Sequence, residues 1–153
     1  MNISLDHLDR AILNVVQRDA SLAIEEISEK VGLSRNACWR RIKALEANGT
    51  IKGRVAILDA SKVGAPLTAF VLVKTSSHDA GWIKQFQTVL AAMPEVVGAH
   101  RMTGELDYIL RVRLADMPAY DDFYKRLTSR ISVSDISASF VMEEIKESTA
   151  VPL

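Results

Sequence analysis

The spacing of hydrophobic residues in the first fifty positions is typical of three short helices. The first is predicted from apolar residues three and four positions apart, namely Leu5, Leu8, Ile12, Val15 and Val16. A second is predicted from about 23 to 31 and ends at Gly32, because glycine readily adopts the left-handed conformation that closes a helix. Ser34 can cap a third helix, in which Cys38, Ile42 and Leu45 share one face.

Beyond these helices the pattern changes to extended segments separated by helices. Lys52–Asp59 is predicted as a strand, and residues 60–66 form a connector that contains Gly64 and Pro66. The segments that follow are predicted in the order strand Thr68–Lys74, helix around 82–90, strand Val96–Met102, turn Thr103–Leu106, strand Tyr108–Leu114, helix after Asp116, and strand from 136 to 142. This order is the split βαβ, or ferredoxin-like, arrangement.

The expected fold is therefore α+β. We predict an N-terminal three-helix helix-turn-helix domain of winged-helix-like type at 1–51, a hinge strand and linker at 52–65, and a ferredoxin-like βαββαβ domain at 66–153. The core of that last domain is expected to include Met117, Tyr120, Tyr124 and Leu127 from its second helix, and Ile136, Ala138, Phe140 and Met142 from its last strand. Trp39, Trp82 and Cys38 are interpreted as packing residues.

Charge is distributed unevenly along the chain, although 19 Lys and Arg against 19 Asp and Glu give a formal net charge of zero. Residues 34–54 hold six basic residues and a single acid, Glu46. The charge of the whole chain therefore gives no indication of a polyanionic partner. The excess of positive charge in residues 34–54, in contrast, is typical of a segment that contacts one.

Several classes of function are excluded by what the sequence lacks. Cys38 is the single cysteine and offers no zinc spacing with the three histidines, so neither a disulfide nor a structural metal is expected. No apolar segment is long enough to span a bilayer, and the N-terminus does not have the pattern of a secretion signal, so we expect a cytoplasmic protein without membrane contact. Phosphate-binding, dinucleotide-binding and nucleophile-elbow motifs are missing, which favours a protein that is not an enzyme and that uses no cofactor.

The strongest chemical signal is the helix-turn-helix over residues 23–53. In this motif the second helix lies in the major groove of double-stranded DNA. Arg35, Asn36 and Arg40 are the candidates for base contacts, because Arg pairs bidentately with guanine and Asn with adenine. Phosphate neutralisation is expected from the remaining basic residues, Arg41, Lys43, Lys52 and Arg54. Ser34, which begins the helix, completes the predicted set of DNA-binding residues. The alternative is a solvated charged face.

Short stretches in both halves of the chain resemble the Lrp/AsnC family of transcriptional regulators. In the N-terminal half these are Leu5–Leu13, Val31–Ser34 and Arg41–Glu46 running into Gly49–Ile51. In the C-terminal half, Gly104–Tyr108 resembles the family's Gly-x-x-Asp-Tyr turn, and Val141–Lys146 resembles its closing strand.

The resemblance implies a regulator that forms dimers and often octamers through its C-terminal domain and responds to an amino acid or a related metabolite held between dimers. By the same likeness the strand at 52–59 would pair with its twin across the dimer. The effector-binding positions implied by the resemblance are Thr103, Gly104, Asp107, Tyr108, Ser139, Phe140 and Val141. A carboxylate such as Asp107 can pair with an α-ammonium group, and glycine lets backbone N–H groups approach a carboxylate.

Each of these positions also has a structural interpretation, which stays open at the level of sequence. Gly104 can supply the positive φ of a hairpin turn, Asp107 can cap that turn, and Tyr108 and Phe140 can be core residues. Two other functions remain as alternatives. One is an architectural protein that compacts DNA without an effector, and the other is a small-molecule sensing or assembly protein that does not bind DNA.

Overall fold

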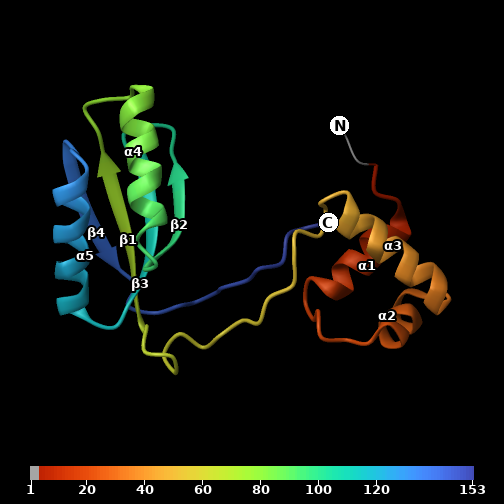
Figure 1. The fold of residues 1–153 in the computed structure, drawn as a ribbon. Helices are drawn as coiled ribbons and strands as arrows, with labels where there is room; N and C mark the ends of the chain where they lie inside the picture. The colour runs from red at the N-terminus through yellow and green to blue at the C-terminus, as the bar shows by residue number, and fades with distance from the viewer. Residues whose placement is uncertain (1–3) are drawn as a thin grey trace. The chain divides into compact units, whose positions relative to one another are not determined.

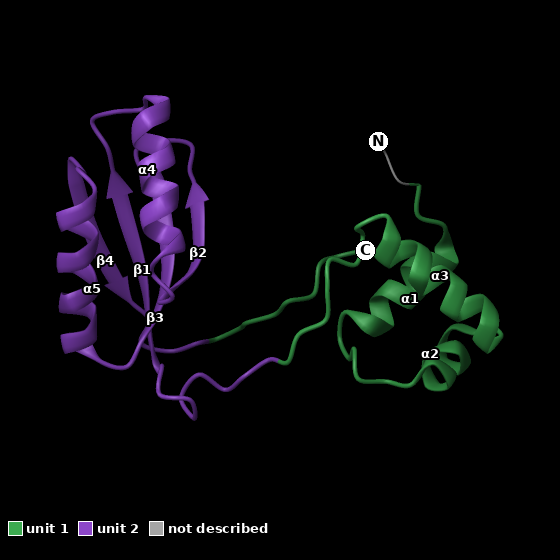
Figure 2. Cartoon of the chain, viewed as in Figure 1, with its two compact units in different colours: residues 1–56, 145–153 green, residues 57–144 purple. Residues whose placement is uncertain are grey.

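The computed structural model describes residues 4–153 and divides the chain into two compact units (Figure 2). One unit holds residues up to Ala56 together with Ile145–Leu153, and the other holds Ile57–Glu144. The last residues of the described chain therefore pack with the N-terminal helices, whereas the sequence pattern grouped them with the C-terminal domain. None of the helices within residues 4–153 combines the length and the apolar character needed to span a bilayer.

The N-terminal unit contains the three predicted helices (Figure 1). They are α1 (His7–Val16), α2 (Ile24–Val31) and α3 (Arg35–Ala47). At the start of α1, the Asp6 carboxylate accepts a hydrogen bond from Asp9 N, and the Asp9 carboxylate accepts one from Asp6 N. This reciprocal cap satisfies two backbone donors that the first turn of a helix leaves free.

A small apolar core holds the three helices together. Its buried side chains are Ile12, Leu13, Val16, Ile27, Cys38, Ile42 and Leu45. Burial raises the pKa of the Cys38 thiol, which keeps it in the protonated, unreactive form expected of a packing residue. Trp39, which the sequence analysis interpreted as a packing residue, lies outside this core, because 53% of its surface is exposed. Trp39 follows Cys38 directly, so the helical rotation of about 100° per residue turns its side chain out of the core.

The second unit is a four-stranded antiparallel sheet with two helices, in the predicted ferredoxin-like order. The elements are β1 (Leu67–Lys74), α4 (Ala80–Ala91), β2 (Val96–Arg101), β3 (Tyr108–Leu114), α5 (Met117–Arg130) and β4 (Asp135–Phe140). The sheet order is β2-β3-β1-β4. In the central pair Val71 lies opposite Leu110 and Val73 opposite Tyr108, so alternate residues of both strands face the helices. The predicted α+β fold class is confirmed.

The core between this sheet and its helices differs from the prediction in α5 and at the end of β4. Phe123 is fully buried, whereas Met117 is 52% and Tyr124 37% exposed. The inner face of α5 is therefore formed by Tyr120 and Leu127, as predicted, and by Phe123 in place of Tyr124. Met142 lies beyond the last strand and is fully exposed.

Two predicted strand segments have no strand structure. Lys52–Asp59 has no regular secondary structure, and the side chains of Val55, Ile57 and Leu58 are largely exposed. A strand requires a hydrogen-bonded neighbour, and no described segment of this chain pairs with it. The closing strand predicted over Val141–Lys146 is likewise not formed, although Val141 N still donates a hydrogen bond to Thr68 O at 2.9 Å.

Candidate nucleic-acid interface and ligand-binding turn

The turn between α2 and α3 is fixed by its own backbone. Gly32 has a φ of 67°, and Leu33 N donates a hydrogen bond to Ser28 O at 2.9 Å, which closes α2. The hydroxyl of Ser34 then accepts a hydrogen bond from Ala37 N and caps α3. Ser34, predicted to take part in the DNA interface, thus sets the start and direction of α3.

One face of α3 is free for an external partner. Burial of Cys38 and Ile42 turns Asn36 and Arg40 to solvent, and the side chains of both lack a hydrogen bond or ion pair within residues 4–153. Lys52, which follows the helix bundle, is exposed and is similarly unpaired among the described residues. The amide of Asn36 and the guanidinium of Arg40 can therefore donate to a ligand without first losing an internal partner.

Three other predicted DNA contacts already have acidic partners. Arg35 forms an ion pair with Glu25, at 2.7 Å between side chains that are 68% and 52% exposed. Lys43 and Arg54 both contact Glu46, at 2.7 and 3.2 Å. The hydrogen bond and charge of Lys43, with a contribution from Arg54, lower the pKa of Glu46. Exposed pairs of this kind contribute little to stability and exchange readily for a phosphate partner.

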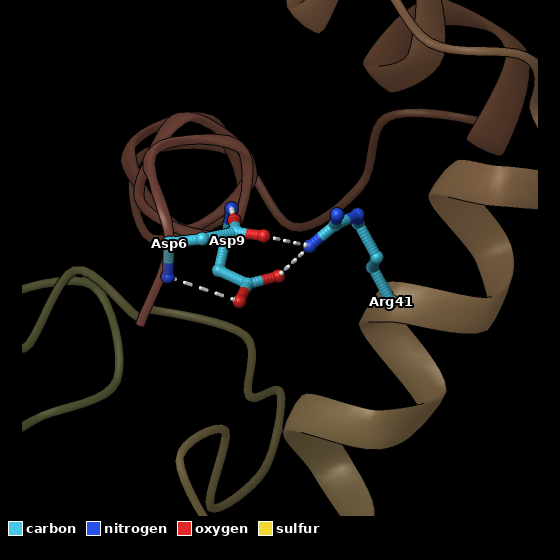
Figure 3. A network of polar contacts seen from close by, with 3 residues as sticks. All are labelled: Asp6, Asp9 and Arg41. Carbon is cyan, nitrogen blue, oxygen red and sulfur yellow. Dashed lines mark hydrogen bonds and ion pairs between the residues drawn. The ribbon is translucent and has the colours of Figure 1, made fainter. Parts of the chain in front are cut away.

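Arg41 is in a different position from the other cations of α3. Its Nη1 lies 2.7 Å from Asp6 Oδ2 and 2.7 Å from Asp9 Oδ1, so one nitrogen binds two carboxylates at the start of α1 (Figure 3). The hydrogen bonds to Asp9 and Asp6 raise the pKa of Arg41. Only 32% of its side chain is exposed. Arg41 thus joins α3 to α1, and its charge is largely compensated before any DNA is present.

The turn between β2 and β3 is organised around Asp107. Its Oδ2 accepts a hydrogen bond from Thr75 N at 2.8 Å, and its backbone bonds to Val73 O and Met102 N hold both sides of the turn. Asp107 Oδ1 lies 3.6 Å from Nε2 of His78, a distance that permits an ion pair when the imidazole is protonated. Thus Asp107 supports the turn and leaves one carboxylate oxygen partly accessible.

The neighbours of Asp107 divide into exposed and buried positions. Thr103 and Gly104 are exposed at the tip, and Gly104 has a φ of 101°, which favours glycine. Tyr108 is only 8% exposed, and its ring lies 4.8 Å from that of Phe86 and 5.6 Å from that of Trp82, measured between centroids. Within a single chain, Tyr108 is therefore a core residue.

The predicted ligand-binding residues form two groups at opposite ends of β1. Asp107 lies at the end marked by Thr75, whereas Val141 bonds to Thr68 near the other end, and Phe140 pairs with Ala69. Six residues of strand, or about 20 Å, separate the two ends. A single chain does not bring Asp107 together with Ser139, Phe140 and Val141.

Sequence reasoning did not identify Thr75 and His78 as neighbours of Asp107. They lie just after β1, in a loop whose polar composition is typical of many loops. The signal that could have found them is the strand register, because Val73 pairs with Tyr108 and this places the residues after Val73 beside Asp107. That register becomes evident only once β1 and β3 are recognised as neighbours.

Comparison with known families assigns both halves of the chain. Residues 5–52 match the family profile described as winged helix-turn-helix DNA-binding. Residues 68–151 match the profile described as Lrp/AsnC ligand binding domain. Together the two profiles span most of the described chain.

Relatives of similar length are transcriptional regulators. The DNA-binding transcriptional activator DecR of Escherichia coli K12 is 47% identical over 150 residues, which cover 97% of this chain and 99% of the relative. A crystal structure of an AsnC family transcriptional regulator from Agrobacterium tumefaciens has a TM-score of 0.93 and 47% identity, over 97% of both chains. A complex of a Neisseria meningitidis transcriptional regulator with L-Met has the same TM-score and coverage at 36% identity.

Proposed function

The chain belongs to the Lrp/AsnC family of transcriptional regulators, and we propose that it binds specific DNA sequences through α3 and adjusts this binding to an amino acid held by its C-terminal unit. The observation that carries the proposal is the pair of unpartnered side chains, Asn36 and Arg40, on the exposed face of the second helix of a helix-turn-helix.

The residues of the DNA interface have separate roles in this proposal. Asn36 and Arg40 contact base edges, and Arg35 joins them after it leaves Glu25. Lys43, Lys52 and Arg54 neutralise phosphates, which contributes affinity without sequence preference. We assign Arg41 a supporting role, because Asp6 and Asp9 already bind its guanidinium. This differs from its sequence-based interpretation as a phosphate ligand.

The proposed effector site is completed by a second copy of the chain. Asp107 provides the negative charge for an α-ammonium group, and exposed backbone at Thr103 and Gly104 can approach the α-carboxylate. Ser139, Phe140 and Val141 of another copy would face the ligand's side chain and select its size. Their separation along β1 supports a site between copies. The L-Met complex of the Neisseria relative supports an amino acid as the ligand class.

Assembly follows from the same argument. We propose that the chain forms dimers and that the dimers associate further, up to the octamer that the resemblance to the family implies. In a dimer, the exposed apolar residues of the 52–59 segment would gain the hydrogen-bonded neighbour that a single chain does not supply. The protein would act in the cytoplasm, as a regulator and not as an enzyme, and would use no metal or cofactor.

The proposal is tested by selecting duplexes from random DNA with the full chain and footprinting the best one. We expect protection of two related half-sites a whole number of helical turns apart, about 34 Å per turn, because two recognition helices are related by a two-fold axis. Protection of one half-site, or no enrichment over the starting pool at physiological salt, would contradict it. A thermal-shift screen of the standard amino acids identifies the effector, since a ligand of the native state raises the melting temperature.

A further inference from the structure

The side chain of Gln17 binds the backbone of Val151, far away in the sequence. Gln17 Nε2 donates a hydrogen bond to Val151 O at 3.1 Å, and Gln17 Oε1 accepts one from Val151 N at 2.9 Å. A single amide thus pairs with both backbone groups of one residue, as a neighbouring strand would. Gln17 is held for this role by its place at the end of α1, where its own backbone N–H donates to Leu13 O.

The segment that Gln17 binds lies along an apolar groove of the N-terminal unit. A cavity of about 390 Å³ is lined by Leu5, Leu13 and Val16, by residues 50–54, and by Thr149, Val151 and Leu153 of the C-terminal segment. All of these residues belong to the same compact unit, which Figure 2 shows in a single colour with the end of the chain. The groove presents hydrophobic surface and one backbone-pairing amide, the combination that recognises an extended apolar peptide.

We propose that this groove is a peptide-docking site on the DNA-binding unit, that residues 149–153 are its ligand, and that docking transmits the state of the C-terminal unit to the DNA-binding helices. The chain passes between the units twice, at 56/57 and at 144/145. The second passage comes four residues after the end of β4, whose last residues Ser139 and Phe140, with Val141, belong to the proposed effector site. A docked tail therefore gives the DNA-binding unit a second attachment, which starts near the strand assigned to the proposed effector site.

The coupling part of this proposal rests on the proposed function. An effector that contacts Val141 or moves the end of β4 would change the freedom of residues 141–148, and through them the occupancy of the groove. By linkage, the occupancy of the groove would then change the affinity for the effector by the same factor. Arg113 lies 3.4 Å from Glu144, so an ion pair holds the tail to the sheet at the point where it leaves the second unit.

Docking is measured in the full chain by hydrogen exchange of the C-terminal peptide, without DNA or effector. We expect the Val151 amide to be protected in the parent protein and to exchange faster in Gln17→Leu, which removes donor and acceptor together. Gln85→Leu is the matched control, since Gln85 Nε2 donates to Arg130 O at 2.7 Å within the other unit. Equal exchange of the C-terminal peptide in all three proteins would overturn the docking proposal.

Coupling is measured as the ratio of DNA dissociation constants with and without L-methionine, or the amino acid that the thermal-shift screen selects. We expect the ratio to approach one in Gln17→Leu, and in Val151→Pro, which removes the tail donor and leaves α1 untouched, while Gln85→Leu keeps the parental ratio. If Gln17→Leu and Val151→Pro both keep the parental ratio of dissociation constants although their C-terminal peptides exchange faster, the transmission step is overturned. A parent that binds DNA but responds to no amino acid would instead refute the effector part of the proposed function, and the transmission step with it.

Discussion

Arg41 of α3 and Asp9 of α1 form a hydrogen-bonded ion pair, with 2.7 Å between Nη1 and Oδ1, and Asp6 binds the same nitrogen (Figure 3). Asp6 and Asp9 also form the cap of α1, so one cluster begins the first helix and positions the recognition helix. The side chain that sequence reasoning assigned to phosphate contact thereby becomes part of the scaffold that orients the base-contacting residues.

Replacing Arg41 should therefore lower stability more than an exposed arginine would. In Arg41→Ala, Asp6 and Asp9 lose a shared cation and face each other as like charges, so we predict a melting temperature several degrees below that of the parent. Arg18→Ala, which removes an exposed cation of the same unit, should leave it nearly unchanged. Circular dichroism melts at neutral pH and matched salt measure both. Equal melting temperatures for the two variants would show that the cluster has no supporting role.

The same cluster predicts a dependence of stability on acid. The backbone N–H of Asp9, with the added hydrogen bond and charge of Arg41, lowers the pKa of Asp6 from its ordinary value of 3.8. A carboxylate whose pKa is lowered by folding stabilises the folded state at pH values above its ordinary pKa. This contribution is lost as the pH falls through the lowered pKa of the folded state. We predict that the parent loses more melting temperature than Arg41→Ala between pH 5 and pH 3. A parallel decline of the two proteins would contradict this.

Local signals predicted the helices well, because caps and stops lie within a few residues of the elements they define. Ser34 and Gly32, which the sequence analysis singled out, each act on the adjacent turn. The alternation in Tyr108–Leu114 likewise predicted a strand with one buried face. Such patterns depend only on residues that are close along the chain, so they can be recognised without knowledge of the tertiary contacts.

The errors concern features that depend on distant partners. The 52–59 segment has a strand-like composition, but strand structure requires a neighbour that this single chain does not provide. Phe123 and Tyr124 are adjacent, and only contact with the sheet decides which of them is buried. The pairing of Arg41 with Asp9 and of Gln17 with Val151 joins residues far apart in sequence, and neither side chain carries a local mark of its partner.

For DNA recognition, Arg40 is the most informative position. Because its guanidinium is exposed and has no partner within residues 4–153, Arg40→Ala should not alter the fold. We predict a loss of about 1–3 kcal/mol in binding to the selected duplex, with a smaller loss for a scrambled duplex. Lys43→Ala should weaken both duplexes to a similar extent. Fluorescence anisotropy at one salt concentration measures all four combinations, and unchanged specific binding by Arg40→Ala would remove it from the set of base contacts.

The two roles of Asp107 can be separated with two substitutions. Asp107→Asn retains an oxygen that can accept from Thr75 N but removes the charge, whereas Asp107→Ala removes both. We predict that Asp107→Asn keeps the parental melting temperature and loses affinity for the amino acid. Asp107→Ala should have both a lower melting temperature and a lower affinity. Calorimetric titration with the amino acid, combined with thermal melts, measures these effects. If Asp107→Asn binds the amino acid as tightly as the parent, the ammonium group is held elsewhere.

The central claim is that an amino acid bound by the C-terminal unit changes DNA binding by α3. Its most direct test is an anisotropy titration of the selected duplex with the full chain, at fixed salt, in the absence and presence of saturating amino acid. We predict that the dissociation constant changes by at least about fivefold, the lower end of typical allosteric coupling. An unchanged dissociation constant, under conditions where calorimetry shows the amino acid bound, would contradict the account.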